Sequence, residues 1–247
     1  MNASRRTAVI VGFLYIIGTV SAILSLSFTQ PILSDPNYLS EIAANEGQII
    51  IGILFWLTMP FTLAMIPVML YPILKINHPV LALGYVVFRG ALETVVGLIM
   101  AISQLLLILL SQQYGAAAAT DTSVFHVLGA FVLKSYTSIN LVLIMAFSLG
   151  TLMLYSMFYQ SRLVPRWMSL WGVVAILLHF STAFLILFHI VPADEISTLL
   201  VINFPIFLQE MVMAVWLIMR GFSSPAVVPP SDVVGIRQIQ ISVGRST

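Results

Sequence analysis

Six long apolar runs set the main constraint on how this chain can fold. An α-helix rises 1.5 Å per residue, so about 20 apolar residues cross the roughly 30 Å hydrocarbon core of a bilayer. We therefore predict an all-α fold, a polytopic membrane helix bundle with six transmembrane helices. The predicted spans are Ala8–Phe28, Gln48–Leu74, Val80–Leu110, Thr137–Gln160, Trp167–Val191 and Thr198–Met219.

Composition excludes the main alternatives to a membrane protein. Of the 247 residues, 60% are hydrophobic and only 8% are charged, whereas soluble domains carry about 25% charged residues. Such a chain cannot cover its surface as a water-soluble enzyme or remain disordered. A net charge of +1 gives no basic field, so no nucleic-acid partner is expected. The absence of cysteine removes thiolate metal sites and cysteine nucleophiles.

Most of the charged residues outside the spans alternate in sign along the threaded path. Under the positive-inside rule this alternation places both termini in the cytoplasm. Residues 1–222 then form one transmembrane domain, and residues 223–247, which are rich in proline, form a flexible cytoplasmic tail. The basic ends carry Arg5, Arg6, Lys75, Arg162, Arg166, Arg220, Arg237 and Arg245, whereas the alternate ends carry Asp35, Glu41, Glu46, Asp121, Asp194 and Glu195.

Two regions outside the predicted spans carry their own expectations. Asn37–Glu46 is predicted to include a short surface helix. Val124–Gln160 is nearly continuous in its apolar character and is too long for one crossing. Either this helix projects beyond the outer face, or Val124–Lys134 is an interfacial segment that leads into the span.

Ionisable residues inside membrane spans are costly and indicate functional sites by default. Here they are Arg89 and Glu93 in the third span and Glu210 in the sixth. His179 in the fifth span is the next candidate. Arg89 and Glu210 each lie about ten residues from the cytoplasmic end of their span. This spacing places both residues roughly 15 Å from the cytoplasmic face of the membrane core, near the midplane of the bilayer.

Helical periodicity gives three spans a polar stripe each. Such stripes are expected to face the interior of a bundle. We predict a central ionic cluster in which Arg89 pairs with Glu93 at i,i+4 and with Glu210 across helices, and Asn140 lies alongside. The stripes are Arg89, Glu93, Gly97, Met100 and Gln104; Asn140, Ser148, Thr151 and Tyr155; and Asn203, Glu210 and Ala214.

Three functions are compatible with this cluster. The first is a site made by Arg89, Glu93, Asn140 and Glu210 that binds or passes a small amphiphilic or anionic ligand, with Arg89 as counter-ion and a carboxylate as proton acceptor. The second is a membrane-embedded enzyme acting on a lipid or isoprenoid, with Glu93 or Glu210 as general acid–base. The third is a structural or sensory subunit in which the ions only lock helix register.

Other sequence features bear on cofactors and helix shape. The four histidines never pair at i,i+3 or i,i+4, so no metal or other cofactor is predicted. Pro60, Pro67 and Pro205 are expected to bend the second and sixth spans. Gly18 and Ala22 give a small-xxx-small spacing that is compatible with a homo-oligomer. The lipid bilayer is also expected as a partner.

The order and spacing of several residue groups resemble a bacterial membrane family, the domain of unknown function 4386, from about Thr7 to Gly221. The resemblance implies a multi-pass helical fold in a bacterial cytoplasmic membrane and implies no activity. Such proteins often carry His where Lys134 stands and Gly where Thr137 stands. The residues that carry it are Tyr38–Glu46; Phe88, Arg89 and Glu93; Tyr136, Asn140, Gly150, Leu154 and Tyr155; Ser161, Arg162, Pro165 and Arg166; and Glu210, Trp216, Leu217 and Gly221.

Overall fold

The computed structural model describes residues 3–116, 122–192 and 196–223, and within these ranges the chain is helical without a strand. Six helical segments are long and apolar enough to cross a membrane, as predicted. The predicted flexible tail, apart from Ser223, lies outside the described residues. The elements are α1 (Ala3–Leu33), α2 (Tyr38–Ala44), α3 (Glu46–Leu74), α4 (Pro79–Tyr85), η1 (Val86–Leu92), α5 (Glu93–Ala116), α6 (Thr122–Ser161), α7 (Arg166–Leu187) and α8 (Ile196–Met219).

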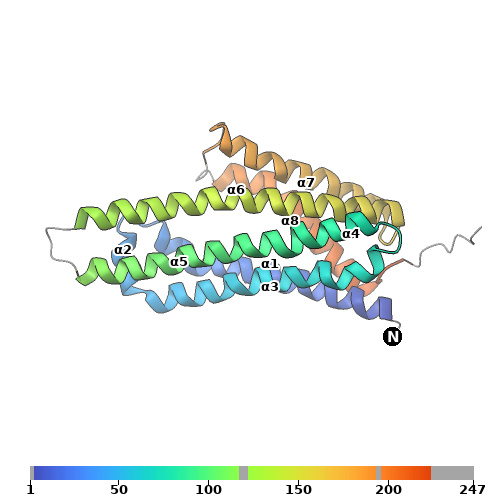
Figure 1. Ribbon diagram of the computed structural model, residues 1–247, viewed down its shortest axis with the longest axis horizontal. Helices are drawn as coiled ribbons and strands as arrows, with labels where there is room; N and C mark the ends of the chain where they lie inside the picture. The colour runs from blue at the N-terminus through green and yellow to red at the C-terminus, as the bar shows by residue number, and fades with distance from the viewer. Residues whose placement is uncertain (1–2, 117–121, 193–195, 224–247) are drawn as a thin grey trace, which may run out of the picture.

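The six long segments pack as a ring whose order follows the chain. Helix α1 packs on α3, α3 on α5, α5 on α6, α6 on α7 and α7 on α8, and α8 closes the ring against α1. The third segment is α4, η1 and α5 running on without a break. Figure 1 shows the helices lying side by side along one long axis. We call the end with the start of α1 and the close of α8 the terminal end, and the opposite end the distal end.

Local sequence signals explain where the helices stop at the terminal end. Pro79 begins α4 at a position that needs no backbone N–H donor. Gly221 follows α8 with a positive φ of 76°, which a residue with a side chain adopts only with strain. Arg5 of α1 donates hydrogen bonds to the carbonyls of Leu217 (2.9 Å) and Ile218 (2.7 Å) at the end of α8. A cation there satisfies carbonyls that have no partner within the helix.

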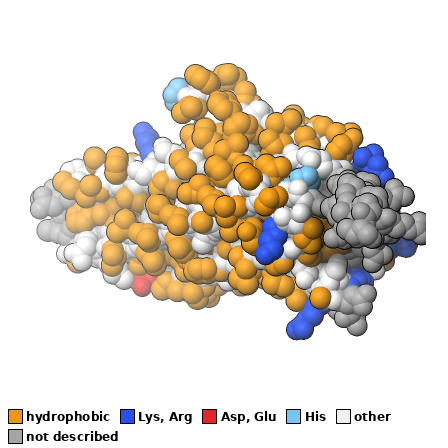
Figure 2. All heavy atoms as spheres, turned by 45° about the vertical axis from the view of Figure 1, so that its right-hand side comes forward, with side chains coloured by type: hydrophobic (Ala, Val, Ile, Leu, Met, Phe, Trp, Pro, Cys, Tyr) orange, Lys and Arg blue, Asp and Glu red, His pale blue; other side chains and the backbone are white. Residues whose placement is uncertain are grey.

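The surface of the bundle suits a lipid environment. Leu54, Phe61, Leu105 and Val174 are among many large apolar side chains that are about half exposed. Figure 2 shows hydrophobic side chains over most of the visible face, with most of the visible Lys and Arg toward one end. The described helices are therefore compatible with a multi-pass membrane protein.

Helix α6 is a single helix of 40 residues, Thr122–Ser161. In the structure this region is one continuous helix with no break at Val124–Lys134. Helices α5 and α6 form a hairpin that reaches the distal end beyond the ends of α7 and α8 (Figure 1). The short surface helix predicted within Asn37–Glu46 is α2.

Candidate functional site

Arg89 is placed by an irregular turn in the third segment. Residues Val86–Leu92 form the π-helical segment η1 between α4 and α5. Short π-helical turns are rare and frequently occur at functional sites. Arg89 is only 2% exposed there and is among the largest fully buried side chains of the described chain. Sequence periodicity predicted a regular helix here, because a 3.6-residue repeat was assumed throughout.

Glu93 holds one side of the Arg89 guanidinium tightly. Arg89 Nη1 donates to both carboxylate oxygens of Glu93, at 2.6 and 2.7 Å. The side chains are 1% and 6% exposed, so the pair is almost completely buried. Buried ion pairs of this kind lose several kcal/mol of stability when one partner is removed. The predicted i,i+4 pairing is therefore present in the structure.

Glu210 reaches the same guanidinium from across the ring. Arg89 Nη2 donates to Glu210 Oε1 at 3.3 Å, and the Glu210 side chain is 12% exposed. This contact is longer than either bond to Glu93, and its carboxylate is the most exposed member of the cluster. We call Arg89, Glu93 and Glu210 the ionic cluster. Their meeting is the interhelical contact that the sequence predicted.

The Arg89 guanidinium keeps an unused donor. Its Nε–H is buried and has no hydrogen-bond partner in the described chain. One face of the group lies over the ring of Phe147 from α6, at 4.2 Å from the centroid, a favourable cation–π arrangement. Nε–H and Nη2–H of a guanidinium point in parallel and form a fork that fits a planar oxyanion. In Arg89 this fork holds only the long contact to Glu210.

Gly150 allows α6 to approach Arg89 closely. A Cβ added at Gly150 would lie 2.9 Å from both the Cβ and the backbone N of Arg89. Such a distance is shorter than packed atoms tolerate, and the backbone of η1 cannot yield as a side chain could. The absence of a side chain at Gly150 therefore sets the spacing between α6 and η1.

Tyrosines and a glutamine surround the ionic cluster. Tyr15, Tyr85 and Tyr155 are at most 1% exposed and lie close enough to Arg89 and Glu210 for electrostatic interaction. Tyr155 donates to Gln209, and Gln209 Nε2 donates to the carbonyl of Met168 at 3.2 Å. This network links α6, α8 and α7. Of these residues the sequence singled out only Tyr155, through the polar stripe of the fourth span.

A second polar group lies between α7 and α8 on the distal side. His179 Nδ1 lies 2.7 Å from Asn203 Oδ1, and the Thr182 hydroxyl donates to the same oxygen at 3.3 Å. The His179 ring meets Phe147 edge-on, with 5.0 Å between centroids. Phe147 therefore contacts His179 as well as the Arg89 guanidinium.

Asn140 stands apart from the cluster it was predicted to join. It is partly buried on α6, two helical turns on the distal side of Phe147, and it makes no hydrogen bond with a described residue of the ionic cluster. Gln104, from the predicted stripe of the third span, receives no partner at its buried Oε1. Its Nε2 donates to the Tyr136 hydroxyl at 3.4 Å.

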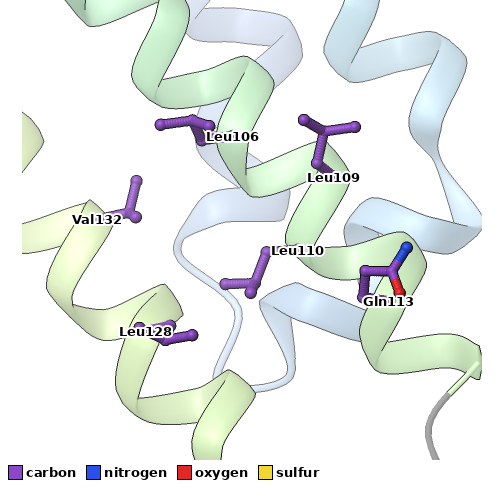
Figure 3. A pocket seen from close by; sticks show the side chains of 6 residues that line it. All are labelled: Leu106, Leu109, Leu110, Gln113, Leu128 and Val132. Atoms are coloured by element: carbon purple, nitrogen blue, oxygen red, sulfur yellow. The ribbon is translucent and has the colours of Figure 1, made fainter.

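An apolar hollow of about 340 Å³ lies between α5 and α6 in their distal halves. Figure 3 shows Leu106 and Leu110 of α5 facing Leu128 and Val132 of α6, with Leu109 and Gln113 on the other side of α5. None of these residues belongs to the ionic cluster. No group of three or more metal-ligating side chains occurs in the part of the chain that the structure describes.

The ionic cluster does not lie at the middle of the third segment. Arg89 is ten residues from Pro79, or about 15 Å, whereas α5 runs on from Glu93 to Ala116. Glu210 lies nine residues from Met219 at the terminal end of α8. The cluster therefore lies nearer to the terminal end of the third segment than to its distal end.

Comparisons with known proteins agree with the helical architecture. Residues 10–221 match the family model described as Domain of unknown function (DUF4386). No significant match is found among curated proteins or among solved structures. Because the matched region spans most of the chain and all six long helices, the chain belongs to the family of domain of unknown function 4386.

Proposed function

We propose that this protein binds and transports a small anion at the ionic cluster and that Glu210 takes up a proton when the anion binds. The observation that supports this proposal is that Glu93 and Glu210 bind the Arg89 guanidinium unequally. Glu93 accepts two short hydrogen bonds, whereas Glu210 makes one contact of 3.3 Å and is partly exposed. Glu93 is thus the fixed counter-ion and Glu210 the exchangeable one.

The charge balance supports this assignment. With all groups ionised, one guanidinium faces two carboxylates, which leaves one uncompensated negative charge in a buried site. An unbalanced buried charge is costly in a low-dielectric interior. Binding of an anion to the fully ionised cluster would leave two uncompensated negative charges, whereas a proton on Glu210 keeps the number at one. The proton also releases Nη2, so that an arriving anion can replace the lost carboxylate charge.

The geometry of Arg89 supports an oxyanion as the ligand. Its unpartnered Nε–H and its loosely held Nη2–H together form the donor pair that binds a planar oxyanion bidentately. The apolar Phe147 ring covers one face of the guanidinium. A small carboxylate with an apolar body suits both features, and this chemistry includes amphiphilic anions.

The proposed setting is a bacterial cytoplasmic membrane with both termini in the cytoplasm. The terminal end of the bundle carries Arg5, Lys75, Arg162 and Arg166, and the distal elements α2 and the start of α3 carry Glu41 and Glu46. By the positive-inside rule the terminal end faces the cytoplasm.

A structural lock is the second candidate, and one observation favours it. The Arg89–Glu93 pair is nearly inaccessible, with side-chain exposures of 1% and 6%. In this case the three ions would only fix the register of α5 and α8, and no anion would compete with Glu210 for Arg89.

Nitrate is a suitable probe because it is planar, binds in the manner of a carboxylate and does not titrate between pH 6 and 9. The unfolding midpoint of the purified protein in detergent would be measured against nitrate concentration, with chloride balancing ionic strength. We expect nitrate to stabilise the folded protein. Its apparent affinity should increase as pH falls, by up to about tenfold per pH unit, because one proton is taken up per anion.

Two variants make the assignment specific. Glu210→Gln mimics the protonated carboxyl, so its nitrate affinity should be high and independent of pH. Arg89→Lys keeps the positive charge but lacks the planar fork, so its affinity should be at least tenfold lower than that of the unmodified protein. If nitrate binds no better than chloride, or binds with no dependence on pH, the cluster is a structural lock and the proposal is wrong.

A further inference from the structure

Packing around the ionic cluster is asymmetric along α6. No side chain between residues 130 and 143 is buried, although this stretch includes Tyr136 and Asn140. On the terminal side the same helix is densely packed: Ser148, Gly150, Thr151, Leu154, Tyr155, Met157 and Phe158 are all buried. The ionic cluster lies at the boundary between these two stretches of α6, because Phe147 and Gly150 both contact Arg89.

Helix α8 repeats this asymmetry on the other side of the cluster. Among residues 200–205 no side chain is buried. From Ile206 onward the inward-facing side chains are buried, and Gln209, Met213, Ala214 and Leu217 are 0% exposed. Helices α6 and α8, which flank α7, are therefore more completely buried on the terminal side of Glu210 than on its distal side.

The lengths of the helices explain the lower burial of side chains in the distal half. Helices α6 and α7 meet at a short turn at the terminal end, but α6 has 40 residues and α7 has 22. At 1.5 Å per residue, about 25 Å of α6 extends past the end of α7. Figure 1 shows the α5–α6 hairpin reaching well beyond α7 and α8 at the distal end.

Polar side chains lie along this open side and lead to the cluster. Asn203 and Glu210 are seven residues apart on α8 and so share one face, about 10 Å apart along the axis. His179 and Asn203 are each partly exposed and hydrogen-bonded at 2.7 Å. The Phe147 ring lies between His179 and the Arg89 guanidinium.

We infer that the anion reaches the ionic cluster from the distal end, along a water-filled path between α6, α7 and α8, and that the His179–Asn203 pair is a polar station on that path. This inference rests on the proposed function. The terminal side is closed by the Tyr155–Gln209–Met168 network and the packed side chains around it. In the described conformation the side chains on the terminal side of the cluster are thus more completely buried than those on its distal side.

The absence of cysteine makes single-cysteine labelling a direct test. Asn140→Cys and Asn203→Cys place a thiol on the inferred path. Thr151→Cys lies on the same helix as Asn140 but is 1% exposed on the terminal side, and Val142→Cys lies near the depth of Asn140 but is 54% exposed on the outer surface. Each variant would be reconstituted in vesicles and treated with a charged methanethiosulfonate reagent, which reacts with thiols in water.

Rapid labelling is expected at Asn140→Cys and Asn203→Cys, at least tenfold faster than at Thr151→Cys and Val142→Cys. Saturating nitrate should slow labelling at Asn203→Cys. The inference is overturned if Val142→Cys reacts as fast as Asn140→Cys, or if Thr151→Cys reacts as fast as Asn203→Cys. It is also overturned if both path variants resist the charged reagent but react with uncharged N-ethylmaleimide, because the gap then excludes charged solutes such as the anion.

Nitrate binding by each variant, measured as above, separates the two proposals. If variants bind nitrate but the labelling pattern fails, the path is wrong and the proposed function stands. If the unmodified protein does not bind nitrate, the proposed function fails whatever the labelling shows.

Discussion

At the scale of single residues, the three nitrogen atoms of the Arg89 guanidinium have three different environments. Nη1 is saturated by Glu93, Nη2 has a long contact to Glu210, and Nε has no partner. Because the guanidinium is rigid and planar, these environments cannot be exchanged by rotation of one bond. The two carboxylates therefore differ in what they contribute, although both belong to the same cluster.

This difference predicts unequal effects of two isosteric substitutions. Glu93→Gln removes the tightly bonded partner of a buried cation, and we expect a loss of about 3 kcal/mol of unfolding free energy. Glu210→Gln leaves a balanced Arg89–Glu93 pair, and we expect a change of less than about 1 kcal/mol. Denaturation in mixed micelles would measure both values. A larger loss of unfolding free energy for Glu210→Gln than for Glu93→Gln would show that Glu210, and not Glu93, is the main partner of Arg89.

Gly150 gives a prediction about packing against Arg89. In Gly150→Ala the new methyl group would meet the Arg89 backbone at 2.9 Å, so α6 and η1 must separate. We expect a loss of about 1–3 kcal/mol. Gly115→Ala is the matched control, since nothing lies within 4 Å of a Cβ added there. Equal thermal stability of the two variants would contradict this account.

At the scale of helices, hydropathy predicted the spans better than it predicted the helix ends. The predicted Ala8–Phe28 and Val80–Leu110 lie within α1 and the α4–η1–α5 segment, which extend to Leu33 and Ala116. Apolar runs mark where lipid can lie, whereas a helix continues as long as it finds packing partners. Ser111 of α5, for example, donates to the carbonyl of Leu39 in α2, at 2.9 Å.

The site residues that could be predicted from the sequence are those whose burial without a partner costs the most free energy. Arg89, Glu93 and Glu210 must find one another because an ion in hydrocarbon is very unfavourable. Asn140 is neutral and partly exposed, so no comparable force directs it toward the cluster, and its role in ligand binding stays a prediction. Gln209 was missed because it lies one residue from Glu210 and only the packed ring shows that both face inward.

Arg5 gives a prediction at this scale, because it ties the first helix to the last. Arg5→Ala removes its hydrogen bonds to the carbonyls of Leu217, Ile218 and Met219. We expect a loss of about 1–2 kcal/mol and faster amide hydrogen exchange in the last turn of α8. Arg6→Ala is the control, since Arg6 is exposed and makes no hydrogen bond within the described residues. Similar amide hydrogen exchange in the two variants would argue against a capping role of Arg5 at the end of α8.

At the scale of the whole molecule, the ring joins the two ends of the chain. Helix α1 packs on α8, and Gly12 lies so close to α8 that an added Cβ would be 2.7 Å from the carbonyl oxygen of Ala214. The ring therefore closes only if α1 and α8 lie side by side with the N-terminal start of one beside the C-terminal end of the other. Six crossings give this arrangement, and five or seven do not.

Membrane topology tests this arrangement with the same cysteine-free chain. Ser4, Ile76 and Ser223 lie at the terminal end, and Asn37 and His189 lie in distal connections. With a membrane-impermeant maleimide, single cysteines at Asn37 and His189 should be labelled in intact cells. Cysteines at Ser4, Ile76 and Ser223 should be labelled only after the membrane is opened if, as proposed from the positive-inside rule, the basic end faces the cytoplasm. The reverse pattern would leave the ring intact and invert its orientation, whereas labelling of Ser4 and Ser223 on opposite sides would be incompatible with six crossings.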